Sequence, residues 1–246
     1  MIPDRLTRDE AKIIAEEEFR RFAALVASLT DDEWTRPTDC TEWDVRKVAL
    51  HVLGSADGQA SVKEFVHQFV RGLPVNKQID SHHFVDGLNE LQIRERSHLS
   101  NADIVAQLQA IGPRAVKGRW RAPAPMRYLP IKFGEPVGWR GWAPMKYLLD
   151  VGFTRDVWAH RIDICEATGR PMQVTPDHDG RLVGDIVAEW ATIYGVPFEL
   201  VLDGPAGGKY SYGVGGERVE MRATDFIRVL SGRIPGTGTL ANPLPL

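Results

Sequence analysis

Two side chains four residues apart, Asp156 and His160, are the strongest candidates for chemistry in this sequence. The segment around them has helical periodicity, and at about 100° per residue they are neighbours on one helix face. They share that face with Leu149, Phe153 and Ile164. A carboxylate on a buried apolar face is unfavourable unless a partner compensates its charge. The pattern therefore indicates either a metal ion bound by both side chains or an Asp–His ion pair.

His51 is the candidate for a third ligand. In the segment DVRKVALHVL it lies beside an apolar face formed by Val45, Val48 and Val52. A lone histidine in that position can be a hydrogen-bonded core residue, but inward-facing histidines and carboxylates from different helices also commonly hold a metal in a bundle. Three protein ligands leave one coordination position open, which is typical of catalytic zinc. The same ligands suit non-haem iron(II), so the residues alone leave the metal open.

The elements that must position these residues are mainly helical. Asp44 is the expected N-cap of the helix that carries His51. Five prolines and three tryptophans predict an irregular connection over residues 119–144. Hydrophobic periodicity predicts helices over residues 8–28, 44–71, 86–118 with a break near 97–101, and 145–165.

The pattern changes after Gly169. A turn-rich linker precedes a helix predicted over residues 180–195. Three short segments, VPFELVL, KYSYGV and ERVEMRA, have the composition of strands and are separated by glycines. A last helix, TDFIRVLSGR, has Thr224 as its expected N-cap. The sequence therefore predicts a mainly α protein, with a helical bundle over residues 1–168 and a small α+β domain over residues 169–246.

Composition excludes several classes of function. With 30 Lys and Arg against 33 Asp and Glu, the net charge of −3 gives no strong attraction to nucleic acid or to an anionic membrane. Charges interrupt every apolar stretch before the roughly 20 residues of a membrane span, and the N-terminus lacks the apolar core of a signal peptide. Cys40 and Cys165 form no CxxC motif. These features predict a reduced, cytoplasmic protein, a monomer or homodimer, with no nucleic-acid or membrane partner.

Three segments carry a resemblance to a known family. TEWDVRKVALHVLG (41–54) and RDVWAHRIDI (155–164) resemble the two metal-binding helices of the DinB-like superfamily. LSGR (230–233), with the strands before it, resembles the C-terminal domain of the mycothiol-dependent maleylpyruvate isomerase family. The resemblance implies a DinB-like four-helix bundle followed by a sterol-carrier-protein-type-2-like α+β domain.

The resemblance also implies a zinc site. It assigns the ligands to His51 from the second helix and to the pair Asp156 and His160, where the family pattern has Glu-x-x-x-His. Aspartate is one methylene shorter than glutamate, so Fe²⁺ or Ni²⁺ stay open beside Zn²⁺. The implied cosubstrate is mycothiol, a low-molecular-weight thiol, and the implied partner is a small-molecule substrate.

These expectations define a hypothesis of function. The protein would be an isomerase or a thiol S-transferase in which a zinc-bound thiolate adds to a small electrophilic substrate. Arg233 is predicted to be catalytic, because a guanidinium can hold a carboxylate through two hydrogen bonds; the other interpretation is a cation that caps a helix C-terminus. The alternatives are a hydrolase that uses metal-bound water and a non-enzymatic metalloprotein that binds a small molecule or lipid.

The remaining motifs give weaker support for a functional site. GPAGGK (204–209) lacks the spacing of a phosphate-binding loop and predicts a turn between strands. His82, His83 and the segment Asp177–Asp179 are predicted to be solvated. Neither cysteine is assigned as a ligand, since Cys165 lies about 140° around the helix from His160. No Gly-x-Ser-x-Gly motif supports acyl-enzyme chemistry.

Overall fold

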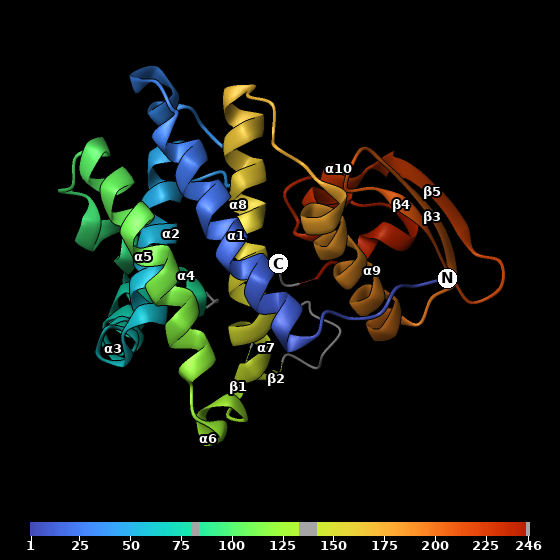
Figure 1. Cartoon of the computed structure of the whole chain (residues 1–246), viewed down its shortest axis with the longest axis horizontal. Coiled ribbons are helices and arrows are strands. Elements are labelled where there is room, and N and C mark those ends of the chain that lie inside the picture. Colours follow the sequence, from blue (N-terminus) through green and yellow to red (C-terminus); the bar gives the residue numbers. More distant parts are fainter. Residues whose placement is uncertain (80–83, 133–141, 245–246) are drawn as a thin grey trace.

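The computed structural model describes residues 1–79, 84–132 and 142–244, which form a helical part beside a smaller mixed part (Figure 1). The helical part consists of a bundle and of two helices that form a hairpin packed against one helix of the bundle. Within the described residues, no helix is both long and apolar enough to cross a membrane. The predicted mainly α fold is confirmed. The helices of the bundle are α1 (Arg8–Ala27), α2 (Val45–Ala60), α5 (Asn101–Arg121) and α8 (Phe153–Thr168), and those of the hairpin are α3 (Val62–Gln78) and α4 (Phe84–Arg96).

Side-chain caps begin the long helices. Thr7 and Glu10 form a capping box at the start of α1, and Ser100 forms one with Asp103 at the start of α5. As predicted, Asp44 caps α2, where its carboxylate accepts a hydrogen bond from the Lys47 backbone N–H at 2.8 Å. Such caps satisfy N–H groups that the first helical turn leaves without a partner. The start of each of these helices is therefore specified by local sequence.

The helix predicted over residues 44–71 is wrong in one respect, because Ser61 divides it. Ser61 has extended backbone, with φ −140° and ψ 119°, and its hydroxyl accepts a hydrogen bond from the Glu64 backbone N–H. A serine that caps the next helix ends one helix and begins another. The chain thereby leaves α2 and enters the α3–α4 hairpin.

The connection predicted over residues 119–144 starts later than expected, because α5 continues to Arg121.

Residues 145–165 are also not one regular helix, since a π-helical turn at Leu148–Gly152 precedes α8. Because a π-helical turn is wider than an α-helical one, the predicted helix face applies only to the residues of α8 and not to Leu149. The short elements before α8 are α6 (Ala124–Arg127), β1 (Pro130–Lys132), β2 (Trp142–Pro144) and α7 (Met145–Tyr147).

The smaller part contains a three-stranded sheet and two helices. The strand order is β4-β3-β5, with β3 antiparallel to β4 and parallel to β5. The three strands and the helix over residues 180–195 were predicted, but the N-cap of the last helix is Arg222 rather than Thr224. The helix follows β5 directly, so Thr224 already lies in its first turn. The elements are α9 (Arg181–Tyr194), β3 (Phe198–Asp203), β4 (Gly208–Tyr212), β5 (Glu217–Arg222) and α10 (Ala223–Leu230).

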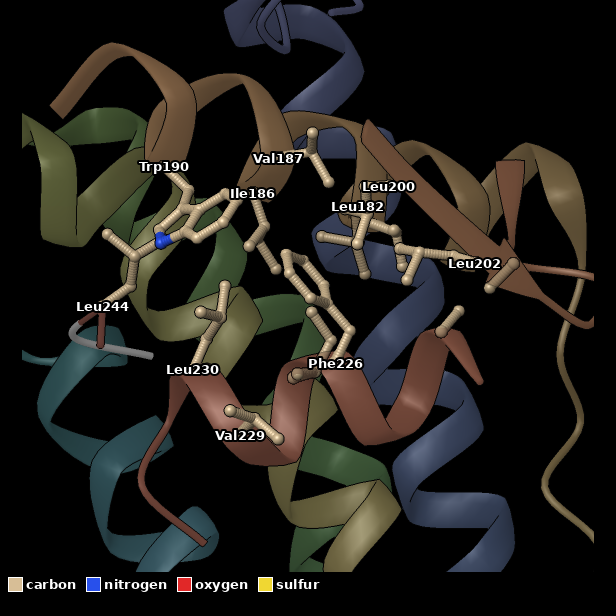
Figure 2. Packing of buried hydrophobic residues seen from close by; sticks show 14 of the residues in the cluster. Leu182, Ile186, Val187, Trp190, Leu200, Leu202, Phe226, Val229, Leu230 and Leu244 are labelled. Carbon is tan, nitrogen blue, oxygen red and sulfur yellow. The ribbon is translucent and has the colours of Figure 1, made fainter. Parts of the chain in front are cut away.

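Two apolar cores meet at α8. Figure 2 shows the core of the smaller part, where Trp190 of α9, Leu200 of β3 and Phe226 of α10 point toward one another. Trp158 of α8 belongs to this core, whereas Val157 and Ile164 of α8 belong to the core of the bundle. One helix therefore contributes to both cores. The division at residues 168 and 169 stays a prediction, although α8 ends at Thr168.

Buried ion pairs also join the two parts. The guanidinium of Arg161 on α8 donates to the Glu18 carboxylate on α1 at 2.7 and 3.0 Å and to Asp179 at 2.6 Å. Arg155, also on α8, donates to Asp185 of α9 at 2.5 Å. All five side chains are buried. Because each charge has a partner of opposite sign, the desolvation cost of burying it is compensated.

The prediction that the segment Asp177–Asp179 is solvated is wrong for two of its residues. His178 and Asp179 are 4% and 0% exposed. Asp179 accepts hydrogen bonds from Arg161 and, at 2.8 Å, from Arg21. Those cations come from α1 and α8, far away in sequence. A local run of polar residues could not show that they would be present.

Candidate metal centre

The three predicted metal ligands come together where α2 packs against α8. His51 lies on α2, and Asp156 and His160 lie one turn apart on α8. The Nε2 atoms of His51 and His160 are each 3.4 Å from a different oxygen of the Asp156 carboxylate. The two imidazole rings have centroids 5.0 Å apart and an interplanar angle of 76°. The fold therefore groups the three side chains, and their role as ligands stays a prediction.

The two separations are long for direct hydrogen bonds and are of the size found between two ligand atoms of one metal ion. Charge-assisted N–H···O bonds are about 2.7–2.9 Å long, which is shorter than the two 3.4 Å separations. Zinc bonds of about 2.0–2.1 Å place two ligand atoms of a tetrahedron roughly 3.3–3.4 Å apart. One ligand atom of each residue lies within 4.8 Å of the others. The donor set thus fits a zinc-sized ion with a fourth position left for another ligand.

The charges of the three groups are coupled. Burial alone would raise the pKa of Asp156, but the imidazoles of His160 and His51 hold it well below its ordinary value. Burial alone would lower the pKa of His160, and the Asp156 carboxylate instead raises it well above the ordinary value. Both shifts express attraction between the carboxylate and a positive charge beside it. A bound metal ion would supply that charge in place of the protons.

Asp163 supports His160 from the side away from Asp156. Nδ1 of His160 lies 2.9 Å from Asp163 Oδ2. Burial would raise the pKa of Asp163, but hydrogen bonds from His160 and Arg233 lower it to about 2. A carboxylate that accepts from Nδ1–H leaves the Nε2 lone pair free for a metal. Asp163 was not among the residues predicted from the sequence, although its position three residues after His160 on one helix was an available signal.

Trp43 packs against both histidines. Its ring centroid lies 5.0 Å from that of His51 and 5.8 Å from that of His160. The histidine side chains are 5% exposed, whereas the Asp156 side chain is 29% exposed. The site is therefore shielded around the imidazoles and reaches solvent at the carboxylate.

Comparison with known proteins places this geometry in a family. Residues 15–165 match the family model described as the mycothiol maleylpyruvate isomerase N-terminal domain. The chain belongs to this family. The matched residues include His51, Asp156 and His160, which all lie in the part of the chain that defines the family. Among curated proteins, none matches the sequence.

Two solved structures of the family have a similar fold. They are crystal structures of the mycothiol-dependent maleylpyruvate isomerase and of a mutant of it, both with a TM-score of 0.56. Their sequences are 16% and 15% identical to this chain, and each comparison covers 93% of this chain and 90% of the other. The likeness thus extends beyond the family match into the smaller C-terminal part.

Arg233, the residue predicted to be catalytic, lies behind His160. Its Nε and Nη2 atoms donate to the two oxygens of Asp163 at 2.5 and 2.8 Å, and its side chain is 10% exposed. The Cys40 sulfur lies 3.5 Å from Asp163 Oδ2 and 3.9 Å from Arg233 Nη2. Arg233 therefore reaches the metal ligand through Asp163, and its catalytic role stays a prediction.

A second group of ligand-type side chains is an ion-pair network. Glu18, His178 and Asp179 each offer an atom within 4.8 Å of the others. Glu18, however, accepts hydrogen bonds from Arg161 and, at 2.7 Å, from His178 Nε2, and Asp179 accepts from two arginines. Side-chain cations already compensate both carboxylates, so we assign no metal to this group.

The structure describes two of the other candidates from the sequence, the GPAGGK segment and Cys165. The first four residues of the GPAGGK segment, 204–207, form the turn between β3 and β4, as predicted, and Gly208 and Lys209 begin β4. Cys165 is buried, and burial raises the pKa of its thiol to about 11. His82 and His83 lie outside the described residues.

Removing the metal is expected to leave the helices folded. Both apolar cores form without any contribution from the three ligands, unlike the core of a small zinc finger. Far-ultraviolet circular dichroism of the protein before and after chelation should therefore be nearly the same, while the thermal midpoint falls because bound metal stabilises the folded state. Loss of the helical signal on chelation would instead make the metal structural and favour the non-enzymatic alternative.

Proposed function

We propose that this protein is a cytoplasmic zinc enzyme that uses mycothiol to isomerise a small electrophilic substrate or to transfer the thiol to it. The observation that carries this proposal is the pair of 3.4 Å separations between histidine Nε2 atoms and the Asp156 oxygens. Membership in a family named for a mycothiol isomerase supports the use of that thiol. Zn²⁺ is the metal we propose, and Fe²⁺ and Ni²⁺ suit the same set of ligand atoms.

Each residue of the site has a role in this proposal. His51, Asp156 and His160 hold the metal, which when bound keeps a thiol ionised at neutral pH. Asp163 holds the His160 ring in the orientation that directs Nε2 to the site. Trp43 shields the imidazoles, so thiol and substrate approach on the more exposed side of Asp156.

Cobalt substitution tests the thiol and the metal together. Adding mycothiol to the Co²⁺-loaded protein should produce a sulfur-to-cobalt charge-transfer band, because a thiolate enters the open position. The zinc form should isomerise maleylpyruvate, followed by absorbance, only when mycothiol is present. Turnover of a hydrolysable substrate without thiol would instead favour metal-bound water. Ligand affinity that survives metal removal would favour a binding protein.

Replacing Arg233 with lysine is expected to lower kcat/KM about ten- to a hundredfold. Lysine keeps the charge and loses the two-pronged hydrogen bond, and the loss of a charged hydrogen bond costs roughly 1.5–3 kcal/mol. Metal content should stay at one ion per chain, because Arg233 is not a ligand. Steady-state kinetics and metal analysis of the same preparation check both points. A variant that loses thermal stability but keeps its activity per folded molecule would show that Arg233 has only a structural role.

A further inference from the structure

Two buried glutamines connect His51 to the backbone of its own helix. Nδ1 of His51 lies 2.8 Å from Gln92 Oε1, and Gln92 Nε2 donates to Gln68 Oε1 at 2.8 Å. Gln68 Nε2 then donates to the Gly54 carbonyl at 2.8 Å. Gln92 belongs to α4 and Gln68 to α3, and the side chains of this chain of hydrogen bonds are at most 5% exposed. Burial largely removes water as an alternative partner.

The far end of this chain of hydrogen bonds fixes its direction. The second hydrogen of Gln68 Nε2 points to Glu64 Oε1, at 2.9 Å. A carbonyl oxygen and a carboxylate can only accept hydrogen bonds. Turning the Gln68 amide over would place its Oε1 against both acceptors, so only one orientation is favourable. Its Oε1 then requires a donor from Gln92.

The need for a donor at Gln68 Oε1 also fixes the orientation of the Gln92 amide beside His51. With its Nε2 committed to Gln68, Gln92 presents Oε1 to His51, and an oxygen acceptor needs a proton on His51 Nδ1. We infer that Gln68 and Gln92 are positioning residues that keep a proton on His51 Nδ1, which leaves Nε2, on the side of Asp156, as the ring atom that can bind the metal. The inference rests on the proposed metal site. His160 obtains the same tautomer from a carboxylate, Asp163, so the two histidines reach it through different partners.

The test uses three variants. Gln68→Met removes the acceptor of the Gln92 amide and leaves the contact between Gln92 and His51 in place. Because the Gln92 amide can then turn over, His51 should become a mixture of tautomers. Gln68→Met with Gln92→Glu should restore the Nδ1–H form, because a carboxylate accepts in either orientation. Gln59→Met is the matched control, a buried glutamine on α2 whose amide donates to Ser55 Oγ at 3.0 Å. Nitrogen-15 NMR of the metal-free proteins reports directly whether His51 Nδ1 carries a proton, whether or not Nε2 is protonated as well.

Zinc affinity, measured by competition with a chromophoric chelator, gives a second readout. Gln68→Met should bind zinc about tenfold more weakly, at the lower end of the effect of outer partners on metal ligands. The double variant should recover most of that loss, and Gln59→Met should match the wild type.

Two results would overturn the inference. One is a wild-type His51 that carries its proton on Nε2, a measurement that needs no variant. The other is a Gln68→Met protein with unchanged tautomer and zinc affinity. A wild-type protein with the Nδ1–H form but no zinc binding would contradict the proposed function and leave the tautomer assignment intact.

Discussion

Replacing His51 and His160 together with alanine is expected to give a folded protein without stoichiometric metal. The wild type should carry about one zinc-like ion per chain after gel filtration, since three ligands define one site. The double variant keeps only Asp156, and one carboxylate of that group cannot hold the ion through the column. Metal content by mass spectrometry and thiol-dependent activity should therefore be lost together. Far-ultraviolet circular dichroism should stay near wild type.

A matched pair of histidine replacements provides the control. His98 is exposed, and His67, whose side chain is 40% exposed, pairs with Glu95 rather than with a proposed ligand. The double variant His67→Ala with His98→Ala should retain full metal content. If the variant lacking His51 and His160 also keeps one ion per chain, the metal site assigned to α2 and α8 is wrong.

Replacing Arg161 with methionine is expected to cost about 3–5 kcal/mol of unfolding free energy. The substitution removes the cation that bridges Glu18 and Asp179 and leaves two buried carboxylates undercompensated. Breaking a buried pair from one side is costly for this reason. In a chain of this size the thermal midpoint should fall by roughly 6–20 °C. Denaturant unfolding followed by circular dichroism measures the free energy.

Arg20→Met is the control for this prediction. Arg20 also pairs with a glutamate on α1, but its side chain is 62% exposed. Exposed ion pairs contribute little to stability, so this variant should unfold close to wild type. Similar midpoints for the two variants would show that the buried network does not hold the bundle and the C-terminal part together.

The sequence was most informative where a pattern is local. Asp156 and His160 could be grouped because helical periodicity fixes neighbours four residues apart. The strands of the C-terminal part could be found from their composition and the glycines between them. The strand order β4-β3-β5 could not be predicted in this way, because it depends on how the link after β4 passes the start of β3. Gly216 in that link has a φ of 106°, and a Cβ there would lie 2.1 Å from the Pro197 carbonyl oxygen.

The supports of the site were harder to find. Gln68 and Gln92 are ordinary helix residues in the sequence, and only the packing of α3 and α4 on α2 brings them to His51. Arg233 is 70 residues from Asp163 along the chain. Local periodicity carries no information about contacts of this kind.

The predicted ligand His160 depends, through Asp163, on Arg233 in the C-terminal part. This dependence limits which C-terminal parts could be exchanged for this one in evolution. A shortened chain ending at Thr168 would keep His51, Asp156 and His160 but would lose Arg233, leaving Asp163 buried without its guanidinium. A C-terminal part grafted from another protein would have to supply an equivalent cation at the same place. We therefore expect the proposed metal site and the C-terminal part to be inherited together, although every predicted ligand lies in the helical bundle.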